Sequence, residues 1–152
     1  MSTIDARFGH VNVTTHDWRR LAAFYTDVFG CEFVPPERDI RGPDLDAATG
    51  LRDAHLFGAH LRLPGHGDTG PTLEIFQYDA LAGHPGSQVD RPGWGHLAFV
   101  VPDVPAAVDA VVAAGGARFG ETVTMQTKDG RRITWVYTTD PDGNIVELQA
   151  WS

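Results

Sequence analysis

Hydrophobic and polar positions alternate over residues 8–14, with two valines on one side and His10, Asn12 and Thr14 on the other. This alternation predicts a strand with one buried face. After Asp17 the apolar residues recur at helical spacing, which predicts a helix that begins at this aspartate cap and ends at Gly30.

Further elements complete a first module over residues 6–80. A short strand is expected at residues 31–34, ended by the two prolines that follow it. Residues 37–54 are polar and lack a sustained period, so a loop or a short irregular helix is expected there. Strands are predicted for His55–Leu63 and Thr72–Tyr78, and residues 81–92, with their prolines and glycines, form a linker.

Residues 93–152 repeat this plan as a second module. A strand at 94–101 leads to Asp103, which caps a helix that runs to a pair of glycines. Strands are expected near 117–125 and 131–138, and a tight turn at 140–144 precedes the last strand, Ile145–Trp151. Each module therefore reads β-α-β-β-β.

The repetition is also visible residue by residue. A shift of 86 positions places Phe8-Gly9-His10 under Trp94-Gly95-His96, Asp17 under Asp103, and Gly30 under Gly116. An internal repeat of this kind fixes the architecture before any single residue is interpreted. The fold class expected is α+β, with two tandem modules in a single domain over residues 1–152.

Composition narrows the function classes. The chain has 152 residues, a formal net charge of −8 and no cluster of lysine and arginine, which argues against a nucleic-acid surface. It has no apolar run of bilayer length and no export signal, so we expect no membrane association. One cysteine, Cys31, cannot form an internal disulfide, which agrees with the cytoplasm. A small-molecule partner is the default expectation.

Strand parity selects candidate metal ligands, because successive side chains in a strand point to opposite faces. With the aliphatic residues of the fourth strand of each module turned toward the helix, the glutamate between them faces away. The histidine of each first strand faces away by the same argument. This shared face is expected to carry His10, Glu74, His96 and Glu147.

Two imidazoles and two carboxylates suit one divalent transition metal, such as Ni, Zn, Co, Mn or Fe. A single histidine or glutamate on a strand face is usually only solvated. The recurrence of both residue types in the two modules argues against that interpretation here.

Other residues could line a substrate cleft beside the metal. Four of them share parity with the ligands, and an aromatic residue that precedes the second histidine could form a wall; each could instead be a packing residue. These five are Asn12, Phe76, Tyr78, Trp94 and Gln149. Arg38 and Arg41 could meet an anionic substrate or be solvated. The remaining histidines, His60 among them, fit no ligand spacing.

The paired modules, the Gly-His openings and the stretch Asp140-Pro141-Asp142-Gly143-Asn144-Ile145-Val146-Glu147-Leu148 resemble the vicinal oxygen chelate superfamily. That group includes glyoxalase I, methylmalonyl-CoA epimerase, extradiol dioxygenases, and fosfomycin- and bleomycin-resistance proteins. The resemblance implies that both modules contribute strands to an open, cupped mixed sheet with a metal cleft. It also implies that the same four residues occupy the ligand positions of the family.

The ligand set favours one branch of this superfamily. A His-Glu-His-Glu set resembles glyoxalase I of the bacterial kind, whereas dioxygenases and fosfomycin-resistance enzymes resemble a His-His-Glu pattern. The epimerase usually has glutamine in place of Glu74, and the drug-binding members generally lack the set. A glyoxalase I-like lyase or isomerase is therefore favoured, with an acyl-CoA epimerase, an extradiol dioxygenase and a non-catalytic drug-binding protein as alternatives.

The chemistry that this resemblance implies is proton abstraction next to a carbonyl. The metal would polarise two vicinal oxygens and stabilise an enediolate, while Glu147 or Glu74 would move the proton. The substrate would be a thiol adduct, the hemithioacetal of a 2-oxoaldehyde, or for an epimerase an acyl thioester. A homodimer is expected, with the metal ligands drawn from one chain or from two.

Overall fold

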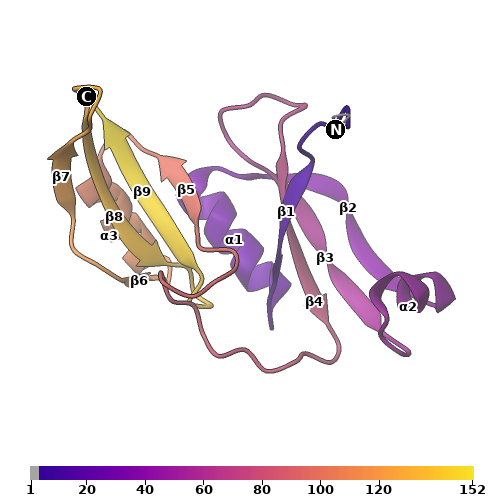
Figure 1. Cartoon of the computed structure of the whole chain (residues 1–152). Helices are drawn as coiled ribbons and strands as arrows, with labels where there is room; N and C mark the ends of the chain where they lie inside the picture. The colour runs from indigo at the N-terminus through magenta and orange to yellow at the C-terminus, as the bar shows by residue number, and fades with distance from the viewer. Residues whose placement is uncertain (1–3) are drawn as a thin grey trace. The chain divides into compact units, whose positions relative to one another are not determined.

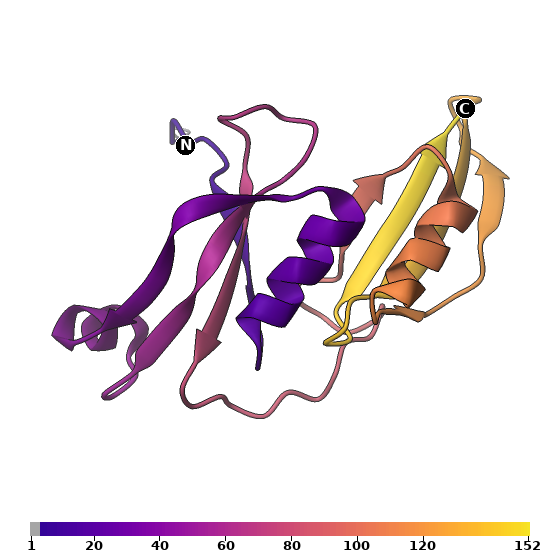
Figure 2. The same cartoon turned by 180° about the vertical axis from the view of Figure 1, so that it is seen from behind.

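The computed structural model describes residues 4–152 of the chain. Contacts between Cα atoms divide it into two compact units, called unit 1 (residues up to Thr26, with Gly30–Ala82) and unit 2 (Asp27–Phe29 with Gly83–Ser152). Each unit contains an open, mixed β-sheet with a helix along one face, as Figures 1 and 2 show. The predicted α+β class is confirmed. Whether the two modules form one domain stays a prediction.

Unit 1 holds four strands in the order β1-β4-β3-β2. Strand β1 runs parallel to β4, and the other neighbours are antiparallel. The elements are β1 (His10–Thr14), α1 (Trp18–Phe29), β2 (Glu32–Arg41), α2 (Pro43–Thr49), β3 (His55–Arg62) and β4 (Thr72–Tyr78).

The predicted caps of helix α1 are confirmed. The side chain of Asp17 accepts a hydrogen bond from the backbone N–H of Arg20 at 3.1 Å, which satisfies one free donor of the first turn. Gly30 ends the helix with a φ of 68°, a conformation that costs glycine little. The apolar side of α1 is buried in the same core as Leu73 and Ile75 of β4.

Strand β2 is longer than the sequence indicated. The prediction that Pro35-Pro36 ends this strand is wrong, because β2 continues through both prolines to Arg41. The strand lies at the edge of the sheet, and its register against β3 shifts between Val34 and Arg38. Prolines are tolerated at an irregular edge because no regular ladder hydrogen bond is lost there. Helix α2 then occupies part of the segment predicted to be a loop or a short helix.

Unit 2 holds five strands, with the order β5-β9-β8-β6 and β7 paired to β8. Its helix, like those of unit 1, is too short to cross a bilayer, and no helix of the described residues is both long and apolar enough to do so. The elements of unit 2 are β5 (Leu97–Val100), α3 (Val104–Ala113), β6 (Ala117–Arg118), β7 (Val123–Gln126), β8 (Arg132–Thr139) and β9 (Ile145–Trp151).

The single strand predicted near residues 117–125 is wrong, because two short strands, β6 and β7, cover this region. The backbone N–H groups of Phe119 and Gly120 both donate to the carbonyl oxygen of Tyr137, each at 3.2 Å. Two residues that share one acceptor cannot continue a one-to-one ladder, so the pairing is interrupted at this point.

Helix α3 packs its valines against the sheet of unit 2. Its predicted cap is confirmed, since Asp103 accepts from the N–H of Ala106 at 2.9 Å. Val108 of this helix and the β9 residues Val146 and Leu148 are completely buried. Burial of alternate β9 residues leaves the side chains between them on the face away from the helix.

Asp140 organises the turn that leads into β9. This buried carboxylate accepts hydrogen bonds from the N–H groups of Asp142 at 2.9 Å and Asn144 at 3.0 Å. Its second oxygen accepts from Nδ2 of Asn144 at 2.8 Å. The turn is therefore held by a side chain whose bonds fix two backbone amides.

Replacing this carboxylate should destabilise the protein. We expect Asp140→Ala to lower the free energy of unfolding by about 3 kcal/mol, because two backbone amides of the turn lose a charged acceptor. Urea unfolding followed by circular dichroism measures this change. The exposed Asp68 offers a control, and Asp68→Ala should stay within about 0.5 kcal/mol of the parent. Equal stability of the two variants would contradict the role of Asp140.

The single cysteine should react slowly in the folded protein. Cys31 is buried, and burial raises the pKa of its thiol to about 11, so little reactive thiolate exists at pH 8. We expect a disulfide reagent at pH 8 to modify the native protein far more slowly than the protein in guanidinium chloride. Between the unfolded thiol's pKa of about 8.5 and 11, only the unfolded state loses the proton, so stability should fall as pH rises. Immediate modification of the native protein would disagree with this burial.

Candidate metal centre

Unit 1 brings His10 and Glu74 together on the face of its sheet opposite helix α1. Strands β1 and β4 are neighbours, and their parallel register sets Asn12 beside Glu74. Because Leu73 and Ile75 are buried on the helix side, Glu74 points the other way. Nε2 of His10 lies 3.6 Å from Oε1 of Glu74.

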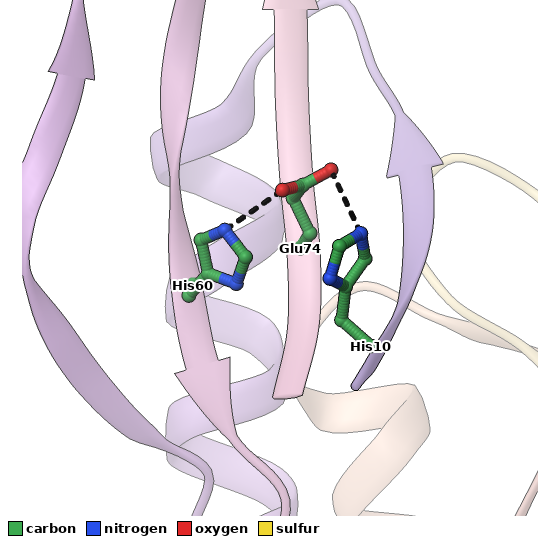
Figure 3. Close-up of side chains that lie close together, drawn as sticks. All are labelled: His10, His60 and Glu74. Carbon is green, nitrogen blue, oxygen red and sulfur yellow. Dashed lines mark ion pairs between the residues drawn. The ribbon is translucent and has the colours of Figure 1, made fainter. Parts of the chain in front are cut away.

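His60 joins this pair, although sequence reasoning set it aside. On β3 it stands directly opposite Glu74, and its Nε2 lies 2.7 Å from Oε2 of Glu74 (Figure 3). The rings of His10 and His60 are nearly perpendicular, with centroids 5.4 Å apart. One ligand atom from each of the three residues lies within 4.8 Å of the others.

The sequence held a partial signal for His60. It alternates with the buried residues Ala59 and Leu61, so parity alone places it on the same face as the predicted ligands. The repeat relates only the first and fourth strands of the two modules, and no second histidine matches His60 in module two. Only the register of the hairpin formed by β3 and β4 sets it opposite Glu74.

Polar neighbours contact the side chains of Glu74 and His60. Nδ2 of Asn12 donates to Oε1 of Glu74 at 3.0 Å, and the hydroxyl of Thr14 donates to Oδ1 of Asn12 at 3.3 Å. On the other side, Nδ1 of His60 lies 2.8 Å from the hydroxyl oxygen of Thr72. Asn12, predicted to line the cleft, thus contacts the carboxylate of Glu74.

Electrostatics favours a neutral His60. Burial lowers the pKa of this imidazole, the charge of Glu74 opposes the shift, and the positive charges of Arg38 and His10 add to it. Arg38 is half-buried on β2, where it pairs with Gly58 of β3. Neutral imidazole is the form that binds a metal, so this environment suits a ligand.

Unit 2 presents a second His–Glu pair in the corresponding place. Nε2 of His96 lies 3.0 Å from Oε2 of Glu147, on the face opposite helix α3. Tyr137 of β8 is paired with Glu147 as His60 is paired with Glu74, and its ring centroid lies 5.1 Å from that of His96. Burial raises the pKa of Tyr137, and the charge of Glu147 adds to the shift.

The remaining predicted cleft residues have different surroundings. Phe76 is half-buried and meets His60 edge-on, with centroids 6.4 Å apart, and Tyr78 is half-buried on the same strand. Gln149 accepts a hydrogen bond from the indole N–H of Trp151. Trp94 precedes β5 with 98% of its surface exposed. Their role in binding a substrate stays a prediction.

The donor set fits a divalent transition metal. Imidazole nitrogen and carboxylate oxygen are ligands of borderline hardness, and all three donors of unit 1 converge. The hydrogen bond from Asn12 to Glu74 and the one between His60 and Thr72 are of the kind that orients metal ligands. Fold and site together define a class: α+β proteins of two similar modules, each with a His–Glu pair on its helix-free sheet face.

The chain belongs to the Glyoxalase/Bleomycin resistance protein/Dioxygenase superfamily, which matches residues 7–148. This agrees with the resemblance inferred from the sequence. No protein with a curated description matches the chain. Members of this superfamily use related sites for different reactions, so membership alone names no substrate.

Solved structures share the fold. A glyoxalase family protein from Bacillus cereus is 19% identical with a TM-score of 0.81, and the match covers 99% of this chain and 98% of that one. A V278E mutant of glyoxalase I from Zea mays is 20% identical with a TM-score of 0.62, covering 93% of this chain and 45% of that one. The fosfomycin resistance protein FosX from Listeria monocytogenes, complexed with Mn(II) and sulfate, is 15% identical with a TM-score of 0.54, covering 97% and 93%.

Proposed function

We propose that this protein is a metal-dependent enzyme of the lyase or isomerase type that moves a proton next to a carbonyl, as glyoxalase I does. The observation that carries the proposal is the His–Glu pair on the open sheet face of each unit, His10 with Glu74 and His96 with Glu147. A protein that only sequesters a drug needs a complementary cleft but no acid–base groups, so four ionisable side chains in matching pairs would be unexplained in it.

His10, Glu74, His96 and Glu147 would hold the metal, with the two pairs supplied by one chain or by two chains of a homodimer. When bound, a divalent ion supplies positive charge that polarises the oxygens of the substrate. We place the protein in the cytoplasm and expect a small-molecule substrate with two neighbouring oxygens, such as a hemithioacetal.

The protein's own contribution is to move one proton. In the hemithioacetal of a 2-oxoaldehyde, Glu147 removes the hydrogen from the carbon that bears sulfur and the hydroxyl group. The same carboxyl group then returns this proton to the neighbouring carbonyl carbon, while the hydroxyl proton moves to the former carbonyl oxygen. The product is a 2-hydroxyacyl thioester, and no atom is gained or lost. An acyl thioester epimerase would return the proton to the original carbon.

Turnover tests the proposal directly. We expect protein loaded with Ni, Co, Zn or Mn to convert hemithioacetals of 2-oxoaldehydes, and protein stripped by a chelator to be inactive until metal returns. Acyl-CoA epimers and catechols, assayed in parallel, test the epimerase and dioxygenase alternatives. Tight metal-independent binding of bleomycin without turnover of any substrate would instead identify a drug-binding protein.

Metal affinity should fall as the pH falls from 7 to 5. Protons compete for every imidazole and carboxylate of the ligand set, and a metal needs these groups deprotonated. Titration calorimetry with Zn²⁺ at several pH values measures the effect. An affinity that does not depend on pH over this range would contradict histidine ligation.

A further inference from the structure

We propose that unit 1 by itself binds one divalent transition metal ion, through Nε2 of His10, Nε2 of His60 and the carboxylate of Glu74. This site goes beyond the proposed function, because it adds a ligand from a third strand and needs no residue of unit 2. It arises from the juxtaposition of β1, β4 and β3, which lie side by side in the sheet.

The three side chains converge without rearrangement of the backbone. Figure 3 shows both imidazoles directed at the two oxygens of Glu74, one from each side. The Glu74 and His60 side chains are only 12% and 16% exposed, whereas His10 is 49% exposed. Because Glu74 is sheltered from water, its attraction to a cation is less screened than at an exposed site. The exposed ring of His10 leaves a route by which the metal ion can reach the site from solvent.

Thr72 allows His60 to change tautomer when a metal binds. In the metal-free protein, Nε2–H of His60 can donate to Oε2 of Glu74, and the Thr72 hydroxyl can donate to Nδ1. A metal on Nε2 requires the ring proton to sit on Nδ1, which then donates to the same hydroxyl oxygen. A hydroxyl both donates and accepts, so the 2.8 Å contact is satisfied in either state.

Asn12 orients the carboxylate of Glu74 so that one oxygen stays available beside His60. Its amide N–H donates to Oε1 of Glu74, and its carbonyl oxygen accepts from Thr14, so the amide has one preferred direction. Oε2 is thereby kept toward His60. Hydrogen bonds of this kind to ligating groups reduce the ordering cost of metal binding.

Unit 2 lacks the third ligand. Its strand β8 places Tyr137 opposite Glu147, where β3 of unit 1 places His60. A phenol is protonated near neutral pH and is a poorer ligand than an imidazole lone pair. The structure therefore assigns independent metal binding to unit 1 and leaves unit 2 with a single His–Glu pair.

The test uses the full chain and Co²⁺, whose absorption spectrum reports its ligands. In the double variant His96→Ala/Glu147→Gln, which removes the two unit 2 ligands of the proposed function, we expect one Co²⁺ per chain still to bind through unit 1, with an affinity about 10–100-fold below that of the parent. His60→Ala in the parent background should weaken binding on the order of 100-fold, and Thr72→Val by about 10-fold or more, as for a lost outer partner. His66→Ala, which alters an exposed histidine outside the cluster, should bind as the parent does.

Two results would overturn the assignment: loss of Co²⁺ binding in the double variant, or parental affinity and spectrum in His60→Ala. If His60→Ala does not fold, as judged by circular dichroism, His10→Ala added to the double variant provides the second test: it should abolish the Co²⁺ binding that remains, and unchanged binding would overturn the assignment. Failure of the proposed function can be told apart from failure of this metal site. In that case the parent would bind Co²⁺ through unit 1 but would turn over no substrate.

Discussion

Glu147→Gln should slow turnover on the order of 10²–10⁴-fold at saturating metal, the usual cost of losing a general base. Glutamine keeps the size of the side chain and one oxygen for coordination but cannot accept the substrate's proton. Glu147 lies on β9 with its side chain only 14% exposed, beside Nε2 of His96.

The hydrogen bonds of the two glutamates favour Glu147 as the base. Both oxygens of Glu74 have partners, since Asn12 donates to Oε1 and His60 lies beside Oε2. Among residues 4–152, Glu147 has one ion-pair contact, from Oε2 to His96, and no hydrogen bond from another donor. A carboxylate with an uncommitted oxygen can accept a proton without breaking a bond that positions it.

Exchange of the substrate's carbon-bound hydrogen with deuterated solvent separates the two roles. Glu147→Gln should lose exchange, while Glu74→Gln should recover part of it as metal is added. Normal exchange in Glu147→Gln with none in Glu74→Gln would reverse the assignment. Normal exchange in both variants would rule out either glutamate as the base.

Gly58→Ala should destabilise unit 1 by about 3 kcal/mol or more. A Cβ atom at this position would lie 2.1 Å from the carbonyl oxygen of Ile75 and 2.7 Å from the ring of Phe76. The oxygen belongs to the backbone of β4, so the clash can be relieved only by moving β3 and β4 apart. These two strands carry His60 and Glu74, so metal affinity should fall together with stability.

A glycine outside the strands provides the control for this substitution. No heavy atom lies within 4 Å of a Cβ built on Gly83, and we expect Gly83→Ala to change the free energy of unfolding by less than about 0.5 kcal/mol. Urea unfolding and Co²⁺ titration of both variants measure the two effects. Gly58→Ala with parental stability would mean that β3 and β4 do not pair as closely as the structure shows.

The sequence by itself determined both longer helices, most of the strands and the direction of the key side chains. The caps at Asp17 and Asp103 and the stop at Gly30 depend on local hydrogen bonds and backbone preferences, which are encoded within a few residues. The alternation along β4 and β9 put Glu74 and Glu147 opposite the helix, because parity within a strand is also local. The repeat then paired each glutamate with a histidine.

Only the tertiary structure decided which residue stands opposite each glutamate and where strand β2 ends. The place of His60 beside Glu74, and of Tyr137 beside Glu147, depends on hairpin register, which cross-strand pairing sets. Pro35-Pro36 does not end β2 because the strand lies at an edge with a register shift, and position in a sheet is not a local property. These contacts join residues of different strands, so the pattern within each strand leaves them open.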